Sequence, residues 1–259
     1  MTADDLLATL RQVIKEPHAA IHRLNLSRIA FCLPPRASDP SLYTLGISRY
    51  AELYLGLEEA WLSCIGDPAD WICEWSEEVP QDPSILSDKE RVRDLLRLLY
   101  IPELPRTRPL EADLCLLRSA GLCDQLLIQS QHLGGEIRND LYQRIMGKPH
   151  ILVAYIWVLY SAILFGGREI CTQLLKAGPE FWGLSVADFA SERTPSPLSF
   201  WNIDDNMAVR AKLRDRILKA DHLLTSQERQ DVLLESKEIF RKFESITTSL
   251  DEDTTKFNV

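Results

Sequence analysis

Apolar residues recur at helical spacing along almost the whole of this 259-residue chain. Val, Ile and Thr nowhere alternate with polar residues over a stretch long enough to form a half-buried strand. Prolines and glycines separate the periodic segments, and no internal repeat is visible. The pattern predicts an all-α protein with a single helical domain over residues 1–250, followed by an acidic tail over residues 251–259 that frays.

The expected helices cover about residues 3–30, 41–64, 88–101, 109–132, 148–177, 204–219 and 225–249. Proline lacks the N–H of an i→i−4 hydrogen bond, so we expect the first helix to be interrupted or kinked at Pro17. The fourth helix is expected to break near Gly121. Thr225 and Glu228 have the spacing of a capping box, which predicts the start of the last helix.

Charge and composition exclude several classes of protein. The net charge of −9 disfavours nucleic acid as a partner, because phosphate backbones repel an acidic chain. We expect no membrane span, since no run approaches the ~18–20 apolar residues that a bilayer requires. The N-terminus MTADDLLATL also lacks the cationic region of a signal peptide. The six cysteines form no CxxC pair, which predicts buried, reduced thiols of a cytosolic protein rather than disulfides or a zinc site.

Four polar residues of the first helix share one stripe: Arg11, Lys15, His18 and His22. A neutral histidine is a good iron ligand, and neighbouring cations can pair with carboxylates of the same ligand. On these residues alone, a solvated polar face with two exposed histidines is the simpler explanation of the stripe. The two histidines could also bind a metal at i, i+4 spacing, although the intervening Glu of an HExxH motif is absent.

A pair of glycines, Gly166 and Gly167, interrupts the apolar segment KPHILVAYIWVLYSAILFGGREICTQLLKAG. Each glycine within a helix costs about 1 kcal/mol relative to alanine. The pair therefore indicates either a bend, or a surface where something large and flat touches the backbone. Tight packing between helices is the alternative.

Together these features resemble the heme oxygenase family. The segment KEPH, ending at His18, resembles the family's proximal Lys-Glu-x-His, and residues 148–167 resemble its distal helix, with LFGG where the family commonly has LSGG. The stretch KLRDRILKADHLLTSQERQDVLLESKEIFRKFESI resembles the last two helices. The resemblance covers most of the chain, is weakest over about residues 70–145, and is closest to fungal heme-oxygenase-like proteins. It implies a multi-helical bundle with heme held between the proximal and distal helices.

The resemblance also implies roles for individual residues. His18 corresponds to the iron ligand. Arg11 and Lys15 match cations near the heme propionates, and Arg210 and Arg214 match a basic pair on the penultimate helix. A charge-assisted hydrogen bond contributes about 1.5–3 kcal/mol, so four cations form a plausible anchor for two carboxylates.

On the distal side, the resemblance assigns the catalytic positions to Ile163, Gly166 and Gly167, and a heme contact to Trp157. The glycines let the distal backbone lie against the porphyrin. The family has an aspartate, which organises proton-delivering water, at the position of Ile163. Isoleucine can neither donate nor accept a hydrogen bond, so this chain differs from the family at a position that takes part in proton delivery.

The implied reaction is the oxidative opening of heme to biliverdin, carbon monoxide and iron, with a reductase partner as the source of electrons. Three alternatives stay open. The first is a heme-independent enzyme of fungal secondary metabolism that acts on a hydrophobic substrate in a cavity lined by Trp157, Tyr160, Phe165 and Trp201. The second is an inactive heme-binding module. The third is a di-iron oxidase that uses His18, His22, Glu58 and Glu59.

Overall fold

The computed structural model describes residues 5–73, 86–119, 124–191 and 197–256. Within these ranges the regular elements are all helical and no strand occurs, which confirms the all-α prediction. In chain order the elements are α1 (Leu6–Phe31), α2 (Ser41–Ile65), η1 (Pro68–Asp70), α3 (Asp88–Leu99), α4 (Thr107–Ser119), α5 (Asp124–Gly147), η3 (Pro149–Ile151), α6 (Leu152–Ser161), η4 (Ala162–Gly167), α7 (Arg168–Leu175), α8 (Val186–Ser191), η5 (Ser199–Trp201), α9 (Asn206–Asp221) and α10 (Ser226–Lys256).

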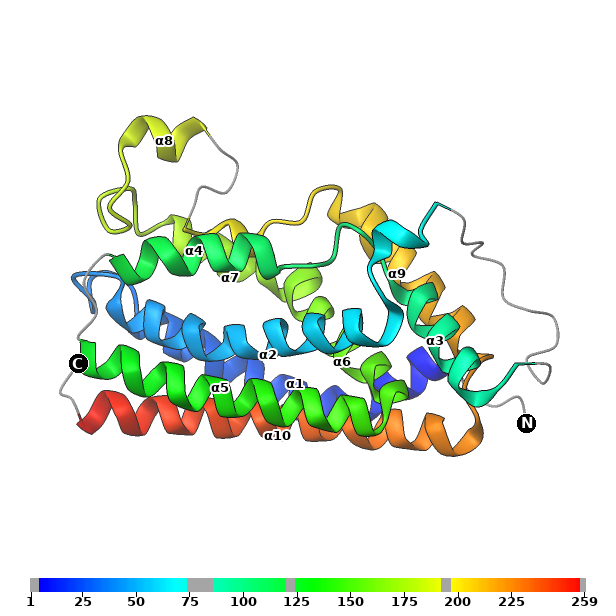
Figure 1. Cartoon of the computed structure of the whole chain (residues 1–259). Coiled ribbons are helices and arrows are strands. Elements are labelled where there is room, and N and C mark those ends of the chain that lie inside the picture. The colour runs from blue at the N-terminus through cyan, green and yellow to red at the C-terminus, as the bar shows by residue number, and fades with distance from the viewer. Residues whose placement is uncertain (1–4, 74–85, 120–123, 192–196, 257–259) are drawn as a thin grey trace.

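The long helices run along one axis of the molecule (Figure 1). The most extensive helix pairs are α2 with α5 and α1 with α10, and α6 packs against both α2 and α10. Helices α3 and α9 contact each other at the end of the bundle opposite to the C-terminus of α10, whereas α8 lies apart from the long helices (Figure 1). This arrangement places α1, α2, α6 and α10 around one interior.

We call the continuous run from η3 to α7 the distal run. Every residue of α6 from Leu152 to Tyr160 is buried, because this helix passes through the core. Its continuation, η4, is a π-helical segment that ends with the two glycines. By length and composition, Pro149–Leu175 is apolar enough to cross a membrane, although we expected no run of that length from the sequence. However, 72% of its most apolar window is buried inside the protein, as in a core helix.

Helix α1 continues through Pro17, so the expected interruption there does not occur. A proline removes only one hydrogen bond, and the buried residues Leu10 and Ile21 hold the helix on either side. Helix α5 extends beyond the predicted end at residue 132, through Gly134. A Cβ atom at Gly134 would lie 2.7 Å from Glu52 Cγ, so this glycine permits close packing of α5 on α2. The predicted break near Gly121 lies outside the described residues.

Helix α10 begins with the predicted capping box, in which Thr225 Oγ1 accepts from the Glu228 N–H at 3.2 Å and Glu228 Oε2 accepts from the Thr225 N–H at 2.8 Å. The helix then continues to Lys256, where fraying was expected from residue 251. Two ion pairs anchor its last turns. Asp251 accepts two hydrogen bonds from Arg28, at 2.7 and 2.6 Å, and Asp253 accepts one from Arg49 at 2.9 Å.

The burial predicted for the cysteines is only partly correct. Cys171 is buried and Cys32 and Cys64 are partly buried, but Cys73 and Cys115 are exposed. None of these five forms a disulfide. The sixth cysteine, Cys123, lies outside the described residues.

Candidate functional site

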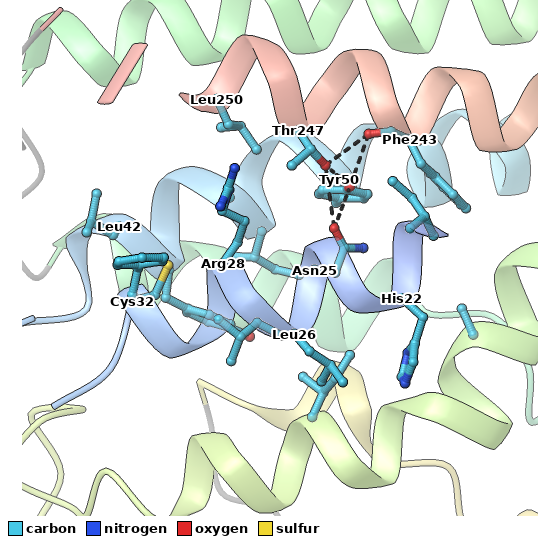
Figure 2. A pocket seen from close by; sticks show the side chains of 18 of the residues that line it. His22, Asn25, Leu26, Arg28, Cys32, Leu42, Tyr50, Phe243, Thr247 and Leu250 are labelled. Carbon is cyan, nitrogen blue, oxygen red and sulfur yellow. Dashed lines mark hydrogen bonds between the residues drawn. The ribbon is translucent and has the colours of Figure 1, made fainter. Parts of the chain in front are cut away.

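A cavity of about 720 Å³ lies between α1, α2, the distal run and α10 (Figure 2). Helix α1 contributes both His18 and His22 to its lining. The distal run contributes one stripe of small and apolar residues, the distal stripe, which consists of Val158, Ala162, Gly166 and Ile170. The two segments singled out in the sequence, about 140 residues apart in the chain, therefore line the same cavity.

The two histidines stack on each other, with their ring centroids 5.9 Å apart. His18 also meets the edge of the Phe240 ring at a centroid distance of 6.1 Å, and His22 Nε2 lies 3.8 Å from Glu169 Oε2 on α7. Desolvation, followed by the charge of His22, lowers the pKa of His18. A lowered pKa favours the neutral imidazole, which is the form that can ligate a metal.

The adjacent glycines have different surroundings. A Cβ atom built on Gly166 meets nothing within 4 Å, whereas one on Gly167 lies 3.2 Å from Trp201 Cε3. Gly166 therefore borders the open cavity, and Gly167 allows close packing against Trp201. Ile163, the position of the family's distal acid, is only 1% exposed and is not part of the cavity lining.

The cations on the first turns of α1 lie outside the cavity lining. Arg11 and Lys15 are both exposed, and the Arg11 guanidinium lies 5.7 Å from the ring centroid of Trp157. Trp157 is 3% exposed, and its buried Nε1 has no hydrogen-bond partner among the residues that the structure describes. Within the described ranges, neither Arg11 nor Lys15 forms an ion pair with a carboxylate.

The basic pair on α9 also lies outside the lining. Arg210 donates to the backbone oxygen of Leu164, and its guanidinium lies 4.5 Å from the ring centroid of Phe165. Its Nε is buried and finds no hydrogen-bond partner within the described part of the chain. Arg214 is exposed. In the part of the chain that the structure describes, neither arginine is paired with a carboxylate.

The aromatic residues proposed to line a substrate cavity divide between core, surface and site. Only Trp201 belongs to the lining, and its Nε1 donates to Tyr43 Oη at 2.9 Å. Tyr160 is fully buried and donates to Glu58, whereas Phe165 is 48% exposed. Helical spacing alone did not distinguish these three environments.

The glutamates considered as iron ligands have structural roles. Glu58 accepts hydrogen bonds from the backbone N–H groups of Arg106 and Thr107, at 2.6 and 2.9 Å, and thereby caps α4. Glu59 forms an ion pair with Arg138 at 2.7 Å. Among the described residues, no group of three or more His, Cys, Asp or Glu side chains is placed to hold a metal ion. The di-iron alternative therefore has no ligand cluster in this part of the chain.

The cavity has polar residues that sequence reasoning missed. Asn25, Tyr50 and Thr247 form a hydrogen-bonded group, the hydroxyl cluster (Figure 2). The Tyr50 hydroxyl lies 2.6 Å from Thr247 Oγ1 and 3.3 Å from Asn25 Oδ1, and Thr247 Oγ1 donates to the backbone oxygen of Phe243 at 3.0 Å. Burial raises the pKa of Tyr50, so its hydroxyl stays protonated. A lone asparagine or threonine on an otherwise amphipathic helix is a weak signal, because the partners are far apart in sequence.

No family model matches the chain, and no curated protein matches it either. Solved structures, by contrast, do match the chain. Heme oxygenase-1 from the cyanobacterium Synechocystis sp. PCC6803, in complex with heme, has a TM-score of 0.63 and 16% identity, covering 98% of this chain and 95% of that one. Heme oxygenase-2 from the same organism, in complex with heme and NO, has a TM-score of 0.60 and 13% identity, covering 96% of this chain and 86% of that one. The chain therefore has a heme-oxygenase-like fold.

Proposed function

We propose that this chain binds heme between α1 and the distal run, with His18 as the iron ligand. One observation carries the proposal: His18 and Gly166 line the same cavity, and the space beside Gly166 is open. A flat macrocycle needs such a place, where no side chain separates it from the helix backbone. The cavity volume of about 720 Å³ also falls within the range typical of small-molecule sites.

The cations outside the lining are candidates for the heme carboxylates. Arg11, Lys15, Arg210 and Arg214 have no carboxylate partner among the described residues, and the buried Arg210 Nε lacks any hydrogen-bond partner. An unsatisfied buried donor is costly, and a ligand carboxylate would relieve that cost. Trp157 would then stay beside Arg11, as a packing surface for its guanidinium.

Bound heme supplies iron-centred redox chemistry with dioxygen, which in the heme oxygenase family opens the ring to biliverdin, carbon monoxide and iron. We include this reaction in the proposal, with a reductase partner as the electron donor. The distal stripe contains no acid, hydroxyl or amide side chain, so the residues facing the ligand there offer no group that could deliver a proton. We therefore expect ring opening to be slow.

A heme titration followed by absorbance tests the binding. Wild type and a control with an exposed histidine replaced, His132→Ala, should both develop a saturable Soret band. His18→Ala should lose that band or shift it, with an unchanged far-ultraviolet circular dichroism spectrum. Absence of saturable binding in the wild type, or identical spectra for His18→Ala, would remove the proposal.

The missing distal acid can be tested at a position that faces the cavity. Ala162 belongs to the distal stripe, whereas an aspartate at Ile163 would be buried in the core. With heme bound and a reductant and oxygen supplied, Ala162→Asp should raise biliverdin production above wild type, and the isosteric Ala162→Asn should not. Equal rates for the two variants would contradict the view that a missing proton donor limits ring opening.

A further inference from the structure

The cavity is elongated along two helices that run in parallel. On α1 its lining extends from His18 to Phe31, followed by Cys32 just beyond the helix, and on α10 it extends from Phe240 to Thr255. At about 1.5 Å per residue, α1 borders it for about 20 Å and α10 for about 22–23 Å. The two helices contact each other near both ends of this length, with His18 beside Phe240 and Arg28 beside Asp251. This shape suits a long, narrow occupant.

Charge is concentrated at one end of the cavity. Apart from the two histidines, the charged residues that line it are, among those the structure describes, Arg28, Arg36 and Asp251. Arg28 is neutralised by Asp251 through two hydrogen bonds, at 2.7 and 2.6 Å. Arg36 forms no ion pair with a carboxylate in the described residues, and its guanidinium lies over the Phe31 ring at 4.4 Å. This end therefore carries one excess positive charge, although the chain as a whole carries −9.

The polar side chains in the middle of the cavity do not need hydrogen bonds from a ligand. The hydroxyl cluster of Asn25, Tyr50 and Thr247 satisfies its own hydrogen bonds, together with the backbone oxygen of Phe243. Figure 2 shows Asn25 and Arg28 on the side of α1 that faces α10, with His22 and Leu26 on its other side. The rest of the wall is mainly aliphatic and aromatic, so an alkyl chain can lie along it without leaving a polar group unsatisfied.

From this combination we infer that the cavity binds a long-chain monocarboxylate, with its alkyl chain running alongside α1 and α10 and its carboxylate at Arg36, beside the Arg28–Asp251 pair. A guanidinium is well suited to a carboxylate, because its parallel N–H donors match the two oxygens. The guanidinium of Arg36 is exposed and lies over the ring of Phe31, which is itself 48% exposed. The inference concerns the cavity of the heme proposal but uses neither His18 nor the metal, so it stands without heme.

Isothermal titration calorimetry with myristate, below its micellar concentration, tests the inference. Tetradecan-1-ol provides the same chain without the charge. We expect saturable binding of one myristate per chain, with an affinity at least about tenfold higher than that of the alcohol, which is the size expected of one charge-assisted hydrogen bond. Arg36→Gln should abolish this preference. Arg93→Gln, which removes an exposed cation outside the cavity, should retain it.

Two further variants test the placement. A Cβ at Gly46 meets nothing within 4 Å and Gly46 lines the cavity, so Gly46→Leu should block myristate without disturbing the fold. The double variant Arg28→Gln/Asp251→Asn keeps the net charge and should bind myristate within about threefold of wild type, because one excess cation remains. Loss of the preference for myristate in this double variant, with retention in Arg36→Gln, would overturn the assignment to Arg36.

The heme proposal and the carboxylate inference can be refuted independently of each other. His18→Ala should lose iron ligation and retain myristate binding. No saturable myristate binding by the wild type, or equal affinity for acid and alcohol, would overturn the carboxylate inference and leave heme binding intact. Myristate binding without any Soret band would support the inference and remove the heme proposal.

Discussion

Replacing each of the paired glycines by alanine separates a ligand-facing position from a packing position. Alanine is favoured over glycine within a helix by about 1 kcal/mol, and neither glycine has a positive φ that would resist the change. The added methyl group at Gly166 meets no atom within 4 Å. We therefore expect Gly166→Ala to raise the free energy of unfolding by about 1 kcal/mol, which corresponds to about 2–4 °C in Tm for a chain of this size.

At Gly167 the same methyl group would lie 3.2 Å from Trp201 Cε3, and Trp201 is held by its hydrogen bond to Tyr43 at 2.9 Å. Overpacking of a filled site typically costs about 1–3 kcal/mol, so this cost cancels or exceeds the gain in helix propensity. Gly167→Ala should therefore be neutral or destabilised by up to about 2 kcal/mol. Gly166→Ala should therefore have the higher free energy of unfolding of the two variants, whatever the absolute values.

Urea and thermal unfolding followed by circular dichroism measure the difference. Gly135→Ala on α5 is a matched control, because a Cβ there also meets nothing within 4 Å but the residue is remote from the cavity lining. It should gain as much stability as Gly166→Ala. Heme affinity should fall only in Gly166→Ala, since only that methyl group enters the cavity. Destabilisation by Gly166→Ala, or equal shifts at both glycines, would refute the division of roles.

Three further predictions concern charges and caps. Asp253→Asn should destabilise the protein by about 3–5 kcal/mol in chemical unfolding, because it leaves the Arg49 guanidinium buried without its carboxylate; a loss below about 1 kcal/mol would contradict this. Glu58→Ala should cost at least about 1–3 kcal/mol by the same measurement, as it removes the cap of α4, and an unchanged midpoint would be inconsistent with that role. An NMR titration should place the pKa of His18 below 6.5, and His22→Gln should move it upward, since His22 contributes to lowering it. Since the pKa of His18 is lower in the folded than in the unfolded chain, the unfolded chain binds the proton more readily, and folding stability falls as pH drops below about 6.5. His18→Gln should reduce this loss of stability.

Short-range features were predictable from the sequence. The capping box at Thr225 and Glu228 formed as expected, because its partners are three residues apart and need no tertiary contact. Helix α2 begins at Ser41, as the periodicity predicts, and ends at Ile65, one residue after the predicted end. Features that depended on neighbours elsewhere in the fold were less predictable. Pro17 did not end α1. Helix α5 continued through Gly134, where the absence of a side chain lets Glu52 of α2 pack against the helix.

The candidate site shows the same division. Periodicity and resemblance together marked His18 and Gly166, and both line the cavity. They did not separate Gly166 from Gly167, nor reveal that Ile163 is buried away from the lining. In a helix the orientation of each position depends on its register, and the π-helical segment changes that register within a few residues.

The sequence by itself determined where most of the helices form and which stripes are apolar, because these properties follow from hydrogen bonds and side-chain preferences within a few residues. Only the tertiary structure decided the charged end of the cavity and the anchoring of α10. Arg28 meets Asp251 and Arg49 meets Asp253 across more than 200 residues of chain. Such pairs are fixed by how the helices pack, and no local pattern records the partner that a charged residue will find.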